Sequence, residues 1–329
     1  MRIGFVGAGR LGKALAWSLA QRGLNVIAAA SHSRESALAL AAPVPGCRAT
    51  DLQTLIDACN LVFITTPDAA IEAAVADGRW RDDMAVVHCS GVTEVTALAA
   101  AAAVGAAGAL TGGFHPMQTF GDPEVAARSL PGCTITIEAP EPLDALLVAL
   151  AERLQCRVNR LPAGMRSRYH AAAGYTSQFV NVLFAEAALL WRSWGASEAQ
   201  AVQALLPLAQ GTLAAIGSAG IARAMPGPVS RGDLGSIAKH LDALAPMGDD
   251  TLDLYRVLSP GRRTRRRPGR PDRCRATVPL VQQRGAIDET LAAVCFPTAR
   301  TSSKCHSAPQ PRSTRFSGAR LLVNCPWNR

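Results

Sequence analysis

The sequence has few aromatic residues, 5% of the total, and none of its nine cysteines forms a Cys-x-x-Cys pair. Without such pairs there is no support for a zinc site or a redox motif, and reduced thiols in a cytoplasmic protein are expected. No run of about 18 uncharged apolar residues occurs, and glycine at positions 4 and 7 comes too early for the apolar part of a signal peptide. We therefore expect a cytoplasmic protein with no metal and no membrane partner.

The charge is distributed unevenly along the chain. The formal net charge is +9, but residues 1–258 carry 19 basic and 22 acidic side chains, whereas residues 259–329 carry 15 and 3. The basicity therefore belongs to the tail, and the body of the protein is not expected to bind nucleic acid. With 49% hydrophobic residues in 329, the chain is also long and apolar enough to bury a core.

The tail, residues 259–329, is set apart by composition. It contains the arginine run RRTRRRPGRPDR at 262–273 and shows neither helical nor strand periodicity. One interpretation is a basic arm that binds nucleic acid or membrane. We favour a disordered low-complexity extension or the product of a shifted reading frame, because arginine runs alone are weak indicators and four cysteines fit an unselected sequence.

The first part of the chain alternates short apolar runs with helical patterns, which is typical of βαβ units and a parallel sheet covered on both faces. We predict an α/β, doubly wound Rossmann domain over residues 1–162. The strands are expected at 3–6, 25–29, 61–65, 85–88, 107–113, 133–138 and 156–161, and the helices near 10–22, 34–41, 51–58, 68–77 and 142–154.

After Pro162 the pattern becomes helical only. Residues 164–194 form an almost unbroken helical pattern, and a second long helix is expected over 197–218 with Ser197 as its N-cap. A Gly/Pro-rich loop at 225–232 and two shorter helices to about 258 follow. We predict an all-helical domain over residues 163–258 that binds substrate and forms a homodimer, because these long apolar helices need a partner surface.

The segment Gly7-Ala8-Gly9-Arg10-Leu11-Gly12 follows a predicted strand and opens a predicted helix. This is the setting that the Gly-x-Gly-x-x-Gly dinucleotide-binding pattern requires. Gly7 would allow the tight turn, Gly9 the close approach of a diphosphate, and Gly12 close packing of helix on strand. The backbone amides and helix dipole at Arg10 and Leu11 would then bind the phosphates, although a plain tight turn would use the same glycines.

The residues after the second strand indicate which dinucleotide is bound. NAD sites place an acidic residue there, whereas this chain has Ser31, Ser33 and Arg34, which suit a 2′-phosphate. We therefore predict NADP(H) as the cofactor. The alternative is that Ser33 only caps the next helix and that Arg34 is solvated.

Two further strand ends carry polar residues that would face the ligand crevice. Thr66 and Pro67 are candidates for contact with the nicotinamide half of the cofactor, while Asp68 is expected to be a helix N-cap. Ser90, in the segment HCSG, is placed to contact the substrate or the ring amide.

The densest unusual segment is GGFHPMQTF at 112–120. Its two glycines bring the backbone close to another group, and Pro116 restricts His115 to extended conformations. We interpret His115 as a site residue that donates or accepts a proton, with a buried structural histidine as the alternative.

A polar stripe is expected on the first long helix. His170, Gly174, Ser177 and Asn181 are spaced by four, three and four residues and would share one face among apolar neighbours. Such a stripe either faces a ligand or forms hydrogen bonds between helices; both remain open. The later segment GPVSRGD at 227–233 is expected to be a loop in which Asp233 caps a helix.

Residues 1–258 resemble the uncharacterised bacterial Rossmann-like NADP oxidoreductases that carry a C-terminal helical domain of unknown function (DUF2520-type). The resemblance rests on GAGRLG at 7–12, HCSG at 88–91, HPMQTF at 115–120, YHAAA at 169–173, and GPVSRGD at 227–233 with His240. More distantly, the chain is similar to pyrroline-5-carboxylate reductases, ketopantoate reductases and hydroxyisobutyrate/phosphogluconate dehydrogenases. The resemblance implies hydride transfer with NADP or coenzyme F420, and a homodimer.

One departure from these relatives concerns the proton donor. The hydroxyacid dehydrogenases carry a catalytic lysine four residues before an asparagine, but Ser177 stands at that offset from Asn181. His115 or His170 would then supply the proton, with Ser90 and Asn181 orienting a small carbonyl or imine substrate between the two domains. The missing lysine also leaves open an NADP-binding sensor without turnover.

Overall fold

The structure is a computed structural model that describes residues 1–103 and 108–259. The predictions made for the basic tail lie outside these residues, apart from Ser259. The chain divides into two compact units, Met1–Gly217 and Ser218–Arg329, and each is described by itself. The boundary expected at residue 162 stays a prediction.

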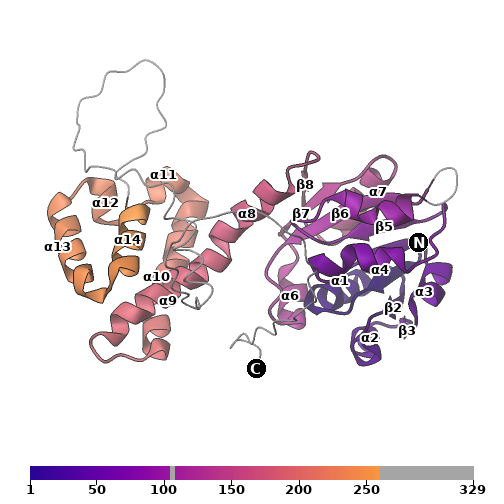
Figure 1. The fold of residues 1–329 in the computed structure, drawn as a ribbon, viewed down its shortest axis with the longest axis horizontal. Helices are drawn as coiled ribbons and strands as arrows, with labels where there is room; N and C mark the ends of the chain where they lie inside the picture. Colours follow the sequence, from indigo (N-terminus) through magenta and orange to yellow (C-terminus); the bar gives the residue numbers. More distant parts are fainter. Residues whose placement is uncertain (104–107, 260–329) are drawn as a thin grey trace, which may run out of the picture. The chain divides into compact units, whose positions relative to one another are not determined.

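The first unit contains an eight-stranded sheet with the order β3-β2-β1-β4-β5-β6-β7-β8 (Figure 1). Strands β1 to β6 are parallel to one another, which confirms the predicted Rossmann fold class. The strands are β1 (Ile3–Val6), β2 (Val26–Ala30), β3 (Arg48–Ala49), β4 (Leu61–Ile64), β5 (Ala85–His88), β6 (Leu110–Met117), β7 (Thr134–Glu138) and β8 (Arg157–Arg160).

The core forms two layers because successive side chains of a strand point to opposite faces. Phe5 of β1 and Phe63 of β4 stack at 5.3 Å in the layer that contains apolar residues of α1 and α7. Val6 and Ile64 belong to the other layer, with α3 and α4. The helices of this part are α1 (Arg10–Gln21), α2 (Arg34–Ala41), α3 (Leu52–Ala58), α4 (Ile71–Ala76), α5 (Ala99–Ala102), α6 (Pro123–Ser129) and α7 (Leu143–Arg153).

The predicted strands and helices are recovered within a few residues, and β3, which has only two residues, was not predicted. The sheet is mostly parallel, as predicted, with one antiparallel step between β6 and β7. The connection between the two strands explains this reversal. A parallel β7 would need a connection that crosses back to the edge of the sheet where β6 begins. Instead, α6 packs its alanines on α1.

Both borders of the sheet are short. β3 has two residues, and β8 has four, of which Arg157, Asn159 and Arg160 are exposed. β8 is parallel to β7.

The first helical stretch is broken, contrary to the expectation of an almost continuous helix. It consists of α8 (Arg166–Thr176) and α9 (Gln178–Arg192), separated by Ser177, whose φ of −123° and ψ of −85° are not helical. The Ser177 hydroxyl donates to the carbonyl of Ala173 at 2.8 Å, a local bond that competes with helical hydrogen bonding.

The longest helix is α10 (Glu198–Ala219). Ser197 caps it as predicted, accepting a hydrogen bond from the amide of Gln200 at 3.2 Å. By length and composition α10 could cross a membrane, with a mean hydropathy of 1.2 over an 18-residue window, although Pro207 lies inside it. Its side chains are mostly exposed, and Leu208 is 67% accessible.

The second unit is helical in its described residues, with α11 (Ile221–Ala224), α12 (Gly227–Arg231), α13 (Leu234–Leu244) and α14 (Asp249–Leu258). The segment expected to be a loop at 225–232 therefore contains a short helix, which Gly232 ends with a φ of +70°. Asp233 caps α13 as predicted, accepting from the amide of Ser236 at 3.0 Å.

Candidate active site

The carboxyl ends of four parallel strands lie in one row across the sheet. Val6 of β1 pairs with Ile64 of β4, Ile64 with His88 of β5, and His88 with Gly113 of β6. The segments that follow β1, β4 and β5 therefore leave the sheet at the same edge, and His115 lies two residues further along β6. In sheets of this type ligands bind at that edge.

The glycine-rich turn after β1 requires glycine at two of its three positions. Gly7 has a φ of +97°, and a Cβ on it would lie 2.6 Å from the amide nitrogen of Thr66. A Cβ on Gly12 would lie 2.6 Å from the Gly7 carbonyl oxygen and 2.7 Å from Thr65 Oγ1. The turn, α1 and the end of β4 are thus packed without room for side chains.

Gly9 differs, because a Cβ there would meet no described atom within 4 Å. Gly9 is the N-cap residue of α1 and is exposed. The first amides of a helix, here those of Arg10 and Leu11, have no partner within the helix. The open side of the turn therefore presents amide donors and a positive helix end to an anion, and the residues present fit a dinucleotide diphosphate.

The residues after β2 include a helix cap, Ser33, and an exposed positively charged side chain, Arg34. Ser33 accepts a hydrogen bond from the amide of Ser36 at 3.3 Å, so the capping alternative for this serine is observed. Arg34, the first residue of α2, is exposed, and Ser31 is half-buried. Neither observation tests the predicted contact with a 2′-phosphate.

The end of β4 corrects one expectation. Asp68 does not cap a helix; it begins a short 3-10 turn at Asp68–Ala70, whose N-cap is Pro67. The negative charge of the Asp68 carboxylate instead partly opposes the lowering of the His115 pKa that burial causes. Thr66 Oγ1 is buried and has no hydrogen-bond partner among the described residues, so this hydroxyl is free to contact a ligand at the strand end.

Side chains of β6 and α8 meet near the end of β6. His115 Nδ1 lies 2.7 Å from the Tyr169 hydroxyl, and the two rings are edge-to-face. The rings of His115 and His170 are 6.1 Å apart. A Cβ on Gly91 would approach both imidazoles, coming within 2.9 Å of His115 Nε2. Both histidines and Ser90 are predicted from the sequence as site residues. Tyr169 is not, although it lies in the segment YHAAA that carries the family resemblance.

The pKa of His115 is lowered to about 4, first by burial and then by the neighbouring His170 and Arg166. The pKa of His88 is lowered to about 3 by burial, Arg166 and His115. An unperturbed histidine titrates near neutral pH, but burial and the nearby Arg166 disfavour a positive charge on His115. At neutral pH His115 is uncharged.

Ser90 and His88 form the turn that positions Gly91. The amide of Ser90 donates to His88 Nδ1 at 3.2 Å. The hydroxyl oxygen of Ser90 accepts from the amides of Val92 and Thr93 at 3.2 and 2.9 Å. Ser90 therefore has an observed structural task, and its predicted contact with substrate stays a prediction.

A buried arginine fixes α8 to the sheet. Arg166 is 0% exposed; its Nε donates to Glu138 Oε2 at 2.6 Å and its Nη1 to the carbonyl oxygen of Ser90 at 2.9 Å. Its Nη2 occupies the space that a Cβ on Gly113 would need. We define this group, Arg166, Glu138 and Gly113, as the arginine lock. Sequence reasoning missed it, since an arginine at a helix start is usually solvated.

The predicted polar stripe is not one continuous face. The break at Ser177 separates His170 on α8 from Asn181 on α9. The Asn181 amide donates to the carbonyl of Ser177 at 3.4 Å, and Asn181 is exposed. A Cβ on Gly174 would meet only the side chain of Gln178, at 3.4 Å. The structure brings His170 to His115 and does not bring Asn181 there.

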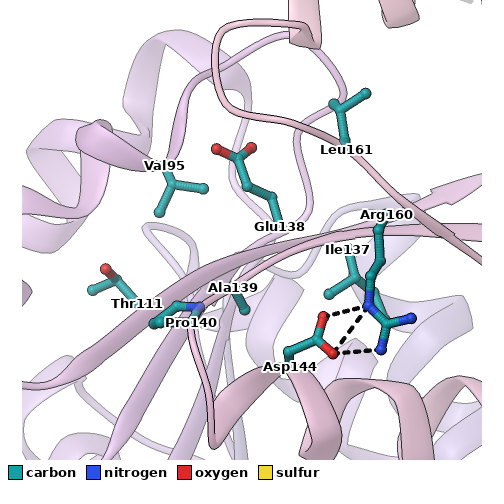
Figure 2. A pocket seen from close by; sticks show the side chains of 9 residues that line it. All are labelled: Val95, Thr111, Ile137, Glu138, Ala139, Pro140, Asp144, Arg160 and Leu161. Carbon is teal, nitrogen blue, oxygen red and sulfur yellow. Dashed lines mark hydrogen bonds and ion pairs between the residues drawn. The ribbon is translucent and has the colours of Figure 1, made fainter.

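A shallow hollow of about 380 Å³ opens beside the lock, and Figure 2 shows Glu138 and the Asp144–Arg160 ion pair among its lining residues. The lining includes neither His115 nor the glycine turn. We place the candidate site at the histidines, because the titratable groups and the strand ends converge there and not in the hollow.

Comparisons with known families agree with this geometry. Residues 2–90 match the family described as NADP oxidoreductase, coenzyme F420-dependent, and residues 133–261 match a domain of unknown function, DUF2520. The two matches, an F420/NADP oxidoreductase Rossmann domain followed by a DUF2520 domain, confirm the resemblance stated from the sequence. No curated protein matches the chain.

Three solved structures are similar over most of the chain. A protein from Bacteroides fragilis with the provisional name NADP oxidoreductase is 27% identical, with a TM-score of 0.61 over 78% of this chain and 96% of its own. A 1-pyrroline-5-carboxylate reductase from Streptococcus pyogenes is 15% identical, with a TM-score of 0.56 over 78% and 98%. A reductive aminase from Aspergillus terreus, in complex with NADPH and ethyl-5-oxohexanoate, is 19% identical, with a TM-score of 0.51 over 78% and 84%. At these low identities, the similarity to the last two structures establishes a shared fold and no shared activity.

Proposed function

We propose that the protein is an NADP(H)-dependent oxidoreductase that reduces a carbonyl or imine group of a small substrate. The observation that carries this proposal is the meeting of His115, Tyr169 and His170 at Gly91, beside the strand ends that hold the glycine turn. The matched oxidoreductase family and the reductive aminase solved with NADPH support the choice of cofactor.

The glycine turn and the start of α1 would hold the diphosphate, and Ser31, Ser33 and Arg34 would bind the 2′-phosphate. When bound, the nicotinamide supplies the hydride. Thr66 and Pro67 lie at the end of β4, on the same edge, and are proposed to contact the nicotinamide half.

The chain's own residues control the proton. Burial raises the pKa of Tyr169, so its phenol stays protonated and is assigned as the donor to His115 Nδ1. The neutral His115 then carries its proton on Nε2, which faces Gly91. We propose that this N–H hydrogen-bonds to the substrate heteroatom, and that the exposed His170 takes a proton from solvent and delivers it to that heteroatom when the hydride has added.

The experiment is a binding titration with NADPH and NADH, followed by a screen of carbonyl and imine substrates, with F420 as an alternative hydride carrier. His115→Ala and His170→Ala are expected to keep NADPH affinity and to lose turnover by about 100-fold, the lower end of general acid–base effects. Full turnover in both variants would refute the assigned roles, and absence of NADPH binding in the wild type would refute the function.

A second candidate is an NADP-binding sensor without turnover. It is favoured by one observation: Ser177 stands where the related dehydrogenases carry lysine, and its hydroxyl is bonded to the Ala173 carbonyl. NADPH binding without activity on any class of carbonyl or imine would select this candidate.

We also propose that α9 and α10 pair with a second copy of the chain. Both helices expose large apolar side chains, including Leu183, Leu206 and Leu213, and a helix that is apolar on most sides needs a covering surface. Light scattering should give twice the monomer mass. A monomer that binds lipid vesicles through α10 would overturn this proposal.

A further inference from the structure

Two cysteines lie side by side where β7 and β8 begin. Cys133 precedes β7 and Cys156 precedes β8, and the first register pair of these parallel strands is Thr134 with Arg157. The two Sγ atoms are 3.6 Å apart, within hydrogen-bonding distance of each other. Both cysteines are free thiols.

The backbone around the pair fixes this approach. Gly132 has a φ of +84° and Gln155 a φ of +58°, so each cysteine follows a residue in the left-handed region. The Gly132 amide donates to the Gln155 carbonyl, and the Arg157 amide donates to the Cys133 carbonyl, both at 2.8 Å. Cross-strand hydrogen bonds therefore flank the pair on both sides. Gln155 is also the one non-glycine residue with positive φ in the described ranges 1–103 and 108–259.

The two sulfurs have different surroundings. Cys156 is buried, and its Sγ lies 3.2 Å from the carbonyl oxygen of Leu130. Cys133 is half-buried. The hydrogen bond from Cys156 lowers the pKa of Cys133, whereas the same bond and burial raise the pKa of Cys156. Cys133 is thus the sulfur that forms a thiolate and can meet a small oxidant, and Cys156 is its protonated neighbour.

We propose that Cys133 and Cys156 form a redox-active dithiol that a hydroperoxide converts to an intramolecular disulfide. Neighbouring strands are about 4.8 Å apart, within the Cα separation that a disulfide spans. This proposal does not depend on the proposed reductase activity.

The chemistry balances in two steps. The Cys133 thiolate attacks the distal oxygen of hydrogen peroxide, its O–O bond breaks, and Cys133 becomes a sulfenic acid while hydroxide leaves. The Cys156 sulfur then attacks the Cys133 sulfur, the S–O bond breaks, and water leaves with the proton of Cys156. Peroxide is reduced by two electrons and the two thiols are oxidised by two.

The pair lies within electrostatic reach of the candidate site. Burial raises the pKa of Tyr169, and negative charge on Cys133 adds to that rise. Forming the disulfide removes this charge, so oxidation would alter the tyrosine that is hydrogen-bonded to His115.

The test uses the full chain, treated with hydrogen peroxide and digested with trypsin after blocking of free thiols. Cys133 and Cys156 fall in separate tryptic peptides, residues 129–153 and 154–157. The expected product is the disulfide-linked pair of these peptides, two hydrogen atoms lighter than their sum, formed before any other cysteine is oxidised.

Three variants sharpen the result. In Cys156→Ser, Cys133 should accumulate as a sulfenic acid that a dimedone-type reagent traps, and in Cys133→Ser no product should form at Cys156. Cys47→Ser is the matched control: Cys47 is also half-buried, but burial raises its pKa to about 11, and the linked peptide should form as in the wild type. Circular dichroism checks that each variant is folded.

The proposal is overturned if peroxide leaves Cys133 reduced in the folded wild type, or if it drives Cys133 directly to sulfinic acid without the link. A link from Cys133 to a cysteine other than Cys156 overturns it as well.

Discussion

Replacing Arg166 by methionine tests the arginine lock directly. Methionine keeps the length of the side chain but removes the charge from a position that is 0% exposed. Glu138 would lose its 2.6 Å partner and the Ser90 carbonyl its donor. Breaking a buried pair by removing one partner costs about 3–5 kcal/mol, which corresponds to a fall of roughly 10 °C in Tm for a unit of this size.

The assay is thermal and urea unfolding followed by circular dichroism. Arg160→Met is the matched control, because Arg160 also pairs with an acid at 2.6 Å but its side chain is 65% exposed. Solvent screens such a pair, so its loss should destabilise far less. Adding Glu138→Gln to Arg166→Met should recover part of the loss, and Gly113→Ala should reproduce it, since a Cβ there displaces the guanidinium.

The lock also makes a functional prediction. Tyr169 and His170 follow Arg166 by three and four residues on α8 and are positioned by its first turn. Arg166→Met should therefore loosen the Tyr169–His115 hydrogen bond, seen as a changed His115 titration in NMR, while NADPH affinity stays the same. If Arg166→Met is as stable as Arg160→Met and leaves the His115 titration unchanged, the arginine lock neither stabilises the fold nor positions Tyr169.

Three further predictions concern the turn, the buried histidines and the site. Gly9→Ala should leave the free energy of unfolding unchanged, because the added Cβ meets no described atom within 4 Å. It should weaken NADPH binding by about 10-fold, or about 1.4 kcal/mol. If calorimetry gives equal NADPH affinity for the variant and the wild type, no phosphate approaches this residue. The lowered pKa values of His88 and His115 stabilise the fold fully above the unfolded value near 6.5. This contribution, on the order of 4 kcal/mol for each histidine, should be lost as pH falls toward 3–4. Urea unfolding across that range should show a flatter acid limb in His88→Gln, and an unchanged limb would contradict the assignment. Tyr169→Phe, which removes the partner of His115 Nδ1, should lower turnover with little change in NADPH affinity, and turnover equal to the wild type would exclude a role for this hydroxyl.

The sequence predicts the fold where the physical signal is local. Buried strands such as β4 and β5 are short runs of apolar residues, and the glycine turn follows one of them, so both could be identified without a structure. The direction of β7 in the sheet could not be predicted, because the alternation of apolar residues in a strand is the same whether the strand is parallel or antiparallel to its neighbour. The break at Ser177 has neither proline nor glycine beside it and depends on a side-chain bond to Ala173.

The candidate site was predicted in part for the same reason. His115 stands out because glycines and a proline surround it, but Arg166 is distinguished only by partners that are 28 and 76 residues away, Glu138 and Ser90. The depressed pKa of His115 also arises from neighbours that only the fold assembles. Long-range contacts of this kind have no counterpart in spacing or composition.

The border strands of the sheet have a consequence for how the protein behaves at high concentration. A sheet whose outer strand is long, flat and apolar invites strands from other molecules. Here one border is only two residues long, and the other has an arginine at each end. Foreign strands thus find few free backbone groups and a border with charged side chains, which disfavours fibrous self-association.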